Sequence, residues 1–281
     1  MVAIRPKTLH SRPLCRTFEV EAEKIWVDLG RASGAGLIRG EETITDDLLL
    51  NVQAAHPYEV ITYQFNKREE PFTGADWEWW LTDGHLWYGL LIQAKRLDLK
   101  SHKYRQIKKR VGKPGTPQID LLIEQARLKG IDPLYFFYNY STGSPSAFTW
   151  NCGTTPFDLY QLGCTVAHAA AVNRVLGKGG AGLPRISPIS YPLRCLVCCP
   201  VLAEPDDSLP GCAHGISKRL RIFAEQVDAA PYGDPHPLAE PPGYVRRLLA
   251  TAPDERDRVI EELREQVGPI GSLIIIKDRR E

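Results

Sequence analysis

The stretch that decides the fold is GADWEWWLTDGHLWYGLLIQAKRL, residues 74–97. Two apolar and aromatic runs flank Asp83-Gly84, a dipeptide that strongly favours a tight turn between two strands. We therefore predict a β-hairpin closed by a two-residue turn. This turn sets a register that places Glu78 opposite Gly89 and Asp76 opposite Leu91.

Polar residues in this hairpin fall on one face. Asp76 and Glu78 alternate with two tryptophans, so the carboxylates share one side of their strand and the indoles take the other. Side chains alternate with period two along the partner strand as well, which puts Gln93 and Lys95 on the carboxylate side, near the open end of the hairpin. The hairpin thus predicts a cluster of two acids, one amide and one amine.

The segments around the hairpin predict an α/β fold, in which helices flank a mixed central sheet. The chain reads as a single domain over 1–281, with a core at about 40–176 and a helical C-terminal extension at about 177–281. Apolar periodicity predicts helices over 14–32, 40–57, 118–130, 156–176, 217–227 and 254–267. β-Branched and aromatic runs predict further strands over 58–66, 133–140 and 272–276.

The composition argues against several classes of protein. Thirty-five Lys and Arg residues balance 34 Asp and Glu residues, a net charge of +1 that argues against coating nucleic acid by bulk charge. The sequence contains no apolar run near the roughly 18 residues that a membrane span needs, and its start has no export signal. These features predict a globular cytoplasmic protein with no membrane partner.

The polar cluster suits hydrolysis of a phosphodiester. Asp76 and Glu78 are candidate ligands for Mg²⁺, or for Mn²⁺, because such hard cations prefer oxygen donors. Glu42, near the start of the second predicted helix, is a candidate third carboxylate. Gln93 would assist at the metal or at the scissile phosphate, and Lys95 would offset the charge that develops on that phosphate.

Asp76 at a strand start, followed by Gln93-Ala94-Lys95 on the next strand, resembles the PD-(D/E)xK nuclease superfamily over about residues 40–140. The pattern is most similar to the Mrr-like branch, in which Gln replaces the usual Glu. The resemblance implies a restriction-endonuclease-like core, Asp76 as a metal ligand, Lys95 as the catalytic lysine and Gln118 as a polar residue near the substrate. It also implies an endonuclease that takes part in bacterial defence against foreign DNA.

An amide is a poorer Mg²⁺ ligand than a carboxylate, so Gln93 leaves a second interpretation open. In that interpretation the chain is a nucleic-acid-binding protein that keeps the nuclease fold and has weak or no turnover.

A basic segment directly follows the predicted site. From Lys95 to Lys113 there are nine Lys or Arg residues and one Asp. Such a run is suited to the phosphate backbone, which gives affinity without sequence choice, and double-stranded DNA is the expected partner. Cutting both strands of a duplex would favour a homodimer. The candidate nucleic-acid contacts are Arg96, Lys100, Lys103, Arg105, Lys108, Lys109, Arg110 and Gln118.

The C-terminal half contains a possible zinc motif. Cys195, Cys198, Cys212 and His214 form a C-x₂-C pair followed by C-x-H, although the second pair is tighter than usual for structural zinc. Reduced, partly buried cysteines are the simpler interpretation. If zinc binds, this region is a candidate zinc-stabilised surface for a partner.

Overall fold

The chain forms a mixed seven-stranded sheet, flanked by helices, in a computed structural model that describes residues 14–65, 74–82, 84–111, 115–143, 148–152, 157–197, 237–268 and 270–277. The strand order is β1-β9-β2-β3-β6-β7-β8. β9 pairs with β2, and β3 with β6, in parallel, and the other neighbours are antiparallel. The predicted α/β class with a mixed central sheet is therefore confirmed. The strands are β1 Val60–Gln64, β2 Trp77–Thr82, β3 Trp87–Arg96, β6 Asp132–Tyr138, β7 Cys164–His168, β8 Tyr191–Pro192 and β9 Ser272–Lys277.

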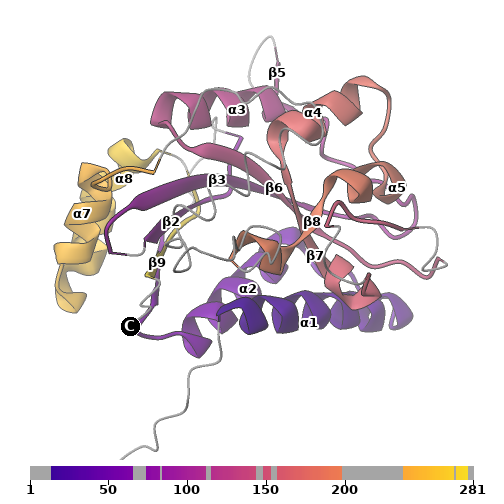
Figure 1. The fold of residues 1–281 in the computed structure, drawn as a ribbon, viewed down its shortest axis with the longest axis horizontal. Helices are drawn as coiled ribbons and strands as arrows, with labels where there is room; N and C mark the ends of the chain where they lie inside the picture. The colour runs from indigo at the N-terminus through magenta and orange to yellow at the C-terminus, as the bar shows by residue number, and fades with distance from the viewer. Residues whose placement is uncertain are drawn as a thin grey trace, which may run out of the picture.

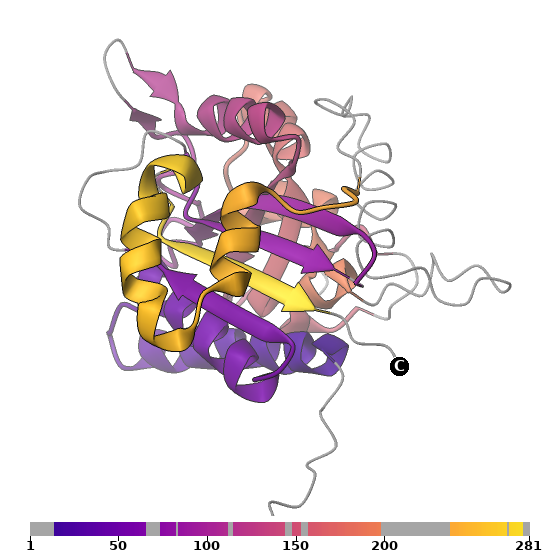
Figure 2. The ribbon, with the colours of Figure 1, turned by 90° about the vertical axis from the view of Figure 1, so that its left-hand side faces the viewer.

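Helices cover both faces of the sheet (Figures 1 and 2). α1 (Leu14–Gly34) and α2 (Glu41–Ala55) lie on one face, and α3 (Gln118–Lys129), α4 (Ala169–Gly177), α7 (Gly243–Ala250) and α8 (Arg256–Val267) lie on the other. No helix in the described ranges is long and apolar enough to cross a bilayer. The shorter elements are α5 Leu183–Ile186, the 3₁₀ helices η2 Leu159–Gly163, η3 Ser187–Ile189, η4 Leu193–Leu196 and η6 Pro253–Glu255, and a small ladder of β4 Arg110–Val111 with β5 Thr116–Pro117.

The three tryptophans of β2 divide between the apolar cores on the two faces of the sheet, as strand alternation requires. Trp77 and Trp79 face α1 and α2, and each contacts the Phe136 ring edge-on, with centroids 5.5 and 5.2 Å away. Trp80 belongs to the core under α3. All three indoles are at most 1% exposed, so the hairpin is the centre of the molecule rather than an edge.

The register of the hairpin corrects the predicted turn. Thr82 pairs with Trp87, so four residues, not two, separate the strands. The shift of two residues preserves the face of every side chain but changes the partners. Gly89 lies opposite Trp80 rather than Glu78. A Cβ at Gly89 would clash with the Ile131 side chain and approach the Trp80 ring within 2.8 Å, so the glycine makes room for an indole and not for a carboxylate.

The predicted helix over 156–176 is wrong in its first half. Residues Leu159–Gly163 form the 3₁₀ helix η2, Cys164–His168 form β7, which pairs antiparallel with β6, and the α-helix covers Ala169–Gly177. Adjacent β-branched Thr165 and Val166 favour a strand, and His168 caps α4 by accepting the Ala170 N–H at 3.2 Å. The predicted helix over 217–227 lies outside the described residues.

The last strand lies inside the sheet. β9 is inserted between β1 and β2, and Leu273, Ile274 and Ile275 are buried. The sequence placed this strand in a C-terminal extension, yet it pairs along its whole length with β2 and over residues 272–276 with β1. The C-terminal segment therefore helps to build the sheet that carries the hairpin. α7, which precedes it, was not predicted.

Gly163 allows α1 to pack directly against the end of η2. A Cβ there would clash with the Ala22 carbonyl oxygen and lie 2.7 Å from the Trp26 nitrogen, and both are backbone atoms that cannot swing away. We expect Gly163→Ala to lower the free energy of unfolding by about 3 kcal/mol, measured by urea denaturation.

Gly34→Ala is the matched control. Gly34 is the last residue of α1, and a Cβ added to it would meet no atom within 4 Å. Alanine there should be neutral or stabilise the protein by up to about 1 kcal/mol, because it favours helix. Equal effects of the two substitutions would show that the close approach at Gly163 does not matter.

Candidate active site

Asp76 lies immediately before β2 and is bonded across to β3. Its backbone N–H donates to the Ile92 carbonyl at 2.8 Å. Its carboxylate accepts the Ala94 N–H at 2.8 Å, and the side-chain amide of Gln93 donates to the same oxygen. The β3 backbone and one buried amide therefore fix the position of this carboxylate.

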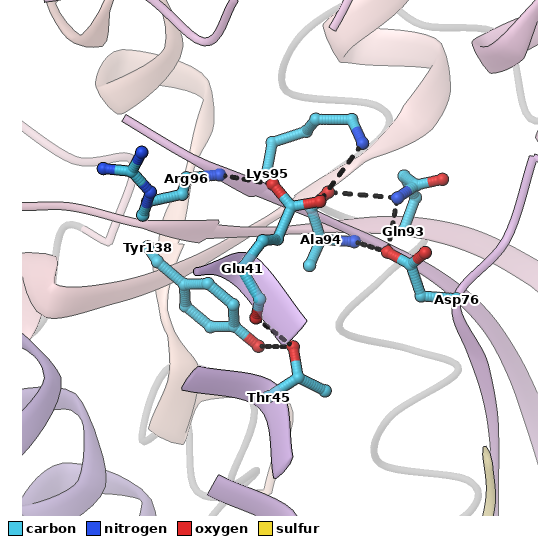
Figure 3. A network of polar contacts seen from close by, with 8 residues as sticks. All are labelled: Glu41, Thr45, Asp76, Gln93, Ala94, Lys95, Arg96 and Tyr138. Carbon is cyan, nitrogen blue, oxygen red and sulfur yellow. Dashed lines mark hydrogen bonds and ion pairs between the residues drawn. The ribbon is translucent and has the colours of Figure 1, made fainter. Parts of the chain in front are cut away.

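Glu41 brings a second carboxylate to the end of β3 (Figure 3). One oxygen accepts the Arg96 N–H at 2.8 Å, and the other lies 3.4 Å from the Lys95 Nζ. Lys95 is only 3% exposed, so its ammonium is held within the protein. The Thr45 hydroxyl donates to the Glu41 carbonyl at 3.0 Å, which secures the first turn of α2.

The sequence explains why α2 begins at this point. Gly40 is extended, and Glu41 and Glu42 occupy the first helical turn, where the helix dipole favours negative charge. The start of the helix thereby carries carboxylates to the end of the sheet.

Charge and burial act against each other at Glu41. Burial raises the pKa of Glu41 and the nearby Asp76 carboxylate raises it further, whereas the Lys95 ammonium and the Arg96 N–H lower it. Two like charges that influence each other, beside a buried amine, form an environment that a bound cation would stabilise.

A cavity of about 260 Å³ opens between α2, β1 and the start of β2. Four of its lining residues are acidic and its other side chains are mostly polar, so it is suited to a hydrated cation rather than to an apolar ligand. The lining residues include Glu41, Glu42, Thr45, Asp46, Gln64, Asp76 and Ser272.

Three buried polar atoms on β3, β6 and α3 have no hydrogen-bond partner among the described residues: Gln93 Oε1, Tyr135 OH and Gln118 Oε1. Gln93 and Tyr135 are neighbours across the β3–β6 ladder. Gln118, at the start of α3, packs close to Gly74, whose φ of +73° and contact with the α3 backbone suit glycine alone. Buried polar atoms of this kind are commonly met by water, an ion or substrate.

Glu78 does not join the candidate site, which corrects its assignment as a metal ligand. It is 0% exposed, and its carboxylate accepts the Lys129 ammonium and the Tyr244 hydroxyl at 2.5 Å each and the Trp80 N–H at 2.6 Å. Burial and the adjacent carboxylate raise the Tyr244 pKa, so the phenol stays a donor. The bonds from Lys129 and Tyr244 link the hairpin to α3 and α7, and we infer a structural role for Glu78.

Glu42 lines the cavity, but Glu41 is the residue that contacts Lys95 and Arg96. Glu42 was predicted from the sequence, and Glu41 was missed. The two are adjacent at a helix start, where an error of one residue turns a side chain by about 100°. Gly40, directly before the helix, is the sequence signal that favours Glu41, the first helical residue, over Glu42.

The basic segment is anchored by its apolar residues. Lys100, Lys103, Arg105, Lys108, Lys109 and Arg110 are exposed. Tyr104, by contrast, is 1% exposed and donates to Asn139 at 2.6 Å, so it is not available to stack on a base. Ile107 is buried beside it. The segment therefore displays cations from a fixed support next to Lys95.

The zinc prediction lies mostly outside the described residues, because these include Cys195 but not Cys198, Cys212 or His214. Cys195 is buried, with its sulfur 3.7 Å from that of Cys152. Within the part of the chain that the structure describes, no group of three or more His, Cys, Asp or Glu residues is arranged to hold a metal ion.

Comparison with known proteins places the chain in a family without an assigned role. Residues 14–280 match a family of unknown function (DUF6615), and because the match spans nearly the whole chain, the protein belongs to that family. No curated protein matches the chain, and no solved structure matches it. Function must therefore be argued from the site.

The Glu78 network gives a stability prediction. Lys129→Met would leave a buried carboxylate without its cation, and we expect it to lower the free energy of unfolding by about 3–5 kcal/mol in chemical denaturation. Arg127→Met on the same helix removes an exposed pair with Glu124 and should cost less than about 1 kcal/mol. A Lys129 variant as stable as the Arg127 variant would contradict the structural role of Glu78.

Proposed function

We propose that the protein is a metal-dependent endonuclease that hydrolyses phosphodiester bonds in DNA. The observation that carries this proposal is the convergence of Glu41, Asp76 and Lys95 at one end of the hairpin, beside an acidic cavity. The sequence pattern resembles PD-(D/E)xK nucleases, and a hairpin followed by α3 and a parallel β6 is compatible with their core.

The donor set at the site is suited to Mg²⁺ or Mn²⁺. Glu41 and Asp76 offer carboxylate oxygens only, and Mg²⁺ typically takes one or two carboxylates and fills its other positions with water and phosphate oxygens. A bound Mg²⁺ would polarise the phosphoryl group. Because no three His, Cys, Asp or Glu side chains among the described residues are arranged to hold a metal, the proposed site relies on two carboxylates and on water and phosphate oxygens.

The chain's own residues have separate tasks in the proposal. Glu41 and Asp76 hold the cation, and Asp76 is kept in place by the Ala94 N–H. Lys95, buried beside Glu41, would neutralise charge that develops on the scissile phosphate and would orient the attacking water. Gln93 has an unpartnered oxygen that could accept a hydrogen bond from that water.

Double-stranded DNA remains the proposed substrate, and the cations of the basic segment are its proposed backbone contacts. Their position directly after Lys95 would bring phosphates to the site. The resemblance to PD-(D/E)xK nucleases adds bacterial defence in the cytoplasm as the proposed setting. A homodimer is the proposed assembly for cutting both strands.

One observation favours the alternative of a nucleic-acid-binding protein with little turnover. The Gln93 amide nitrogen donates to the Asp76 carboxylate, so it occupies lone pairs that a metal would use. If this contact persists in solution, the fold binds DNA without cutting it.

Metal-dependent cleavage tests the proposal. Plasmid and linear duplex DNA should be cut with Mg²⁺ or Mn²⁺ and not with EDTA. We expect Glu41→Gln, Asp76→Asn and Lys95→Met each to reduce the cleavage rate about 100-fold or more, because each removes charge at the reacting centre.

Glu42→Gln is the matched control, since it changes the neighbouring acid of the same cavity and should retain most activity. Circular dichroism and thermal unfolding would establish that the variants are folded. DNA binding without cleavage by the unsubstituted protein, under every metal condition, would reject the nuclease and support the alternative.

The basic segment gives an independent prediction. Lys103→Gln with Lys108→Gln should weaken binding to duplex DNA and reduce the dependence of log affinity on log salt by about 0.9 per lost phosphate contact. The measurement is fluorescence anisotropy in EDTA at several salt concentrations.

The control is Lys24→Gln with Arg246→Gln, which removes the same charge from exposed positions on α1 and α7. If both double variants change the salt dependence equally, the basic segment is not the DNA contact.

A further inference from the structure

A second cavity lies next to the candidate site and is lined by very different chemistry. It measures about 260 Å³ and is formed by the end of α1, the loop that leads into α2, and the start of the basic segment. We call it the α1–basic-segment groove. Its lining includes Leu37, Ile38, Arg96, Asp98, Lys100 and Arg105.

One wall of the groove is apolar and exposed. Leu37 is 68% exposed and Ile38 is 82% exposed, the most exposed pair of adjacent large apolar side chains in the described residues. Exposing such side chains next to each other costs solvation free energy, and apolar surface of this kind often marks a binding site.

The loop that carries this wall is held in place. The Leu37 N–H donates to the Ala32 carbonyl at 2.8 Å, and Gly36 adopts a left-handed turn with φ of +70°. Arg39 joins Asp28 of α1 to Asp47 of α2. The exposure of Leu37 and Ile38 is therefore a property of a fixed loop.

The opposite wall is cationic. Lys100 is exposed, the Arg105 guanidinium is 63% exposed although it lies 2.9 Å from Asp98, and Arg96 completes the set. Asp98 accepts hydrogen bonds from the Ser101 backbone and hydroxyl, which helps to fix the turn that carries these cations. An apolar wall facing guanidinium and ammonium groups is complementary to a nucleotide, which has an apolar base face and an anionic phosphate.

The groove and the candidate site share their framework. Arg96 donates its backbone N–H to Glu41 of the site, and its side chain lines the groove. Arg39, in the groove, lies two residues before Glu41. A strand whose phosphate lay at Lys95 would therefore have a neighbouring nucleotide at the groove.

We propose that the α1–basic-segment groove binds one unpaired nucleotide of the nucleic-acid strand, with its base against Leu37 and Ile38 and its phosphates on Arg96, Lys100 and Arg105. This inference rests on the proposed function and deepens it: within double-stranded DNA, the protein would favour a site at a strand end, a bulge or a short single-stranded stretch. The base would be held by shape and apolar contact, without sequence choice.

The test compares two single-stranded probes in EDTA by fluorescence anisotropy. One is a 15-nucleotide oligodeoxythymidine, and the other has the same length and charge but abasic sugars at its central positions. We expect the natural strand to bind about tenfold more tightly, and Leu37→Ala with Ile38→Ala to abolish that preference. Leu50→Ala with Leu128→Ala, which shortens two other exposed leucines, should leave it intact.

Equal affinity for the two probes, no binding of either, or a preference that survives in the Leu37/Ile38 variant would each overturn the proposal. A change of oligomeric state in that variant, by sedimentation, without loss of base preference would instead identify the groove as a contact between two copies of the chain.

The two proposals can fail separately. Metal-dependent cleavage by a protein with no base preference would leave the nuclease intact and reject the groove. A base preference that depends on Leu37 and Ile38, without cleavage, would support the groove and reject the nuclease.

Discussion

The bonds made by Asp76 join three strands at one point, and the rest of the candidate site depends on that junction. Its N–H donates to β3, its carbonyl accepts the Gly271 N–H from the turn before β9, and its carboxylate accepts the Ala94 N–H. A residue that closes the backbone of a sheet at its start cannot move without opening the ladder. The carboxylate is thereby held rigidly, and the organisation that a reactive site needs comes from main-chain hydrogen bonds rather than from side-chain packing.

The second carboxylate depends on this junction indirectly. Glu41 accepts the Arg96 N–H at the point where β3 ends, so a side chain from the helix start satisfies a main-chain donor at the strand end. Lys95 is buried between them, and its ammonium would be costly without the carboxylate at 3.4 Å. Strand pairing, the hydrogen bond to Glu41 at the start of α2 and charge pairing thus meet in four consecutive residues of β3, and the polar groups proposed for chemistry also complete the fold.

The class of fold could be predicted from alternation and turn chemistry, because the hairpin pattern at 74–97 is long and strongly apolar. The exact register could not, since a four-residue loop and a two-residue loop preserve the same faces. Asp76, Gln93 and Lys95 were brought together as predicted because that depends on parity alone. Glu78 was misassigned because its partners, Lys129 and Tyr244, are 51 and 166 residues away in the sequence, and local periodicity contains no such contacts. β7 was missed because the alanines that directly follow it, Ala169, Ala170 and Ala171, begin a real helix.

The amide at position 93 can be understood from the charge of its surroundings. Glu41 and Asp76 carry two negative charges when ionised, and Lys95 offsets one, in a place where burial already raises the Glu41 pKa. A glutamate at Gln93, which is 1% exposed, would add a third buried carboxylate and raise the Glu41 pKa further. Gln93 instead donates a hydrogen bond to Asp76, and its side-chain oxygen has no hydrogen-bond partner among the described residues. If the Gln93 amide turned over, its oxygen rather than its nitrogen would lie beside the Asp76 carboxylate. Without a cation the two oxygens would repel each other, whereas a cation between them would make this arrangement favourable. In the proposed function, the same side chain would stabilise the site without metal and would offer it an oxygen ligand with metal, so a neutral residue here is compatible with the proposal.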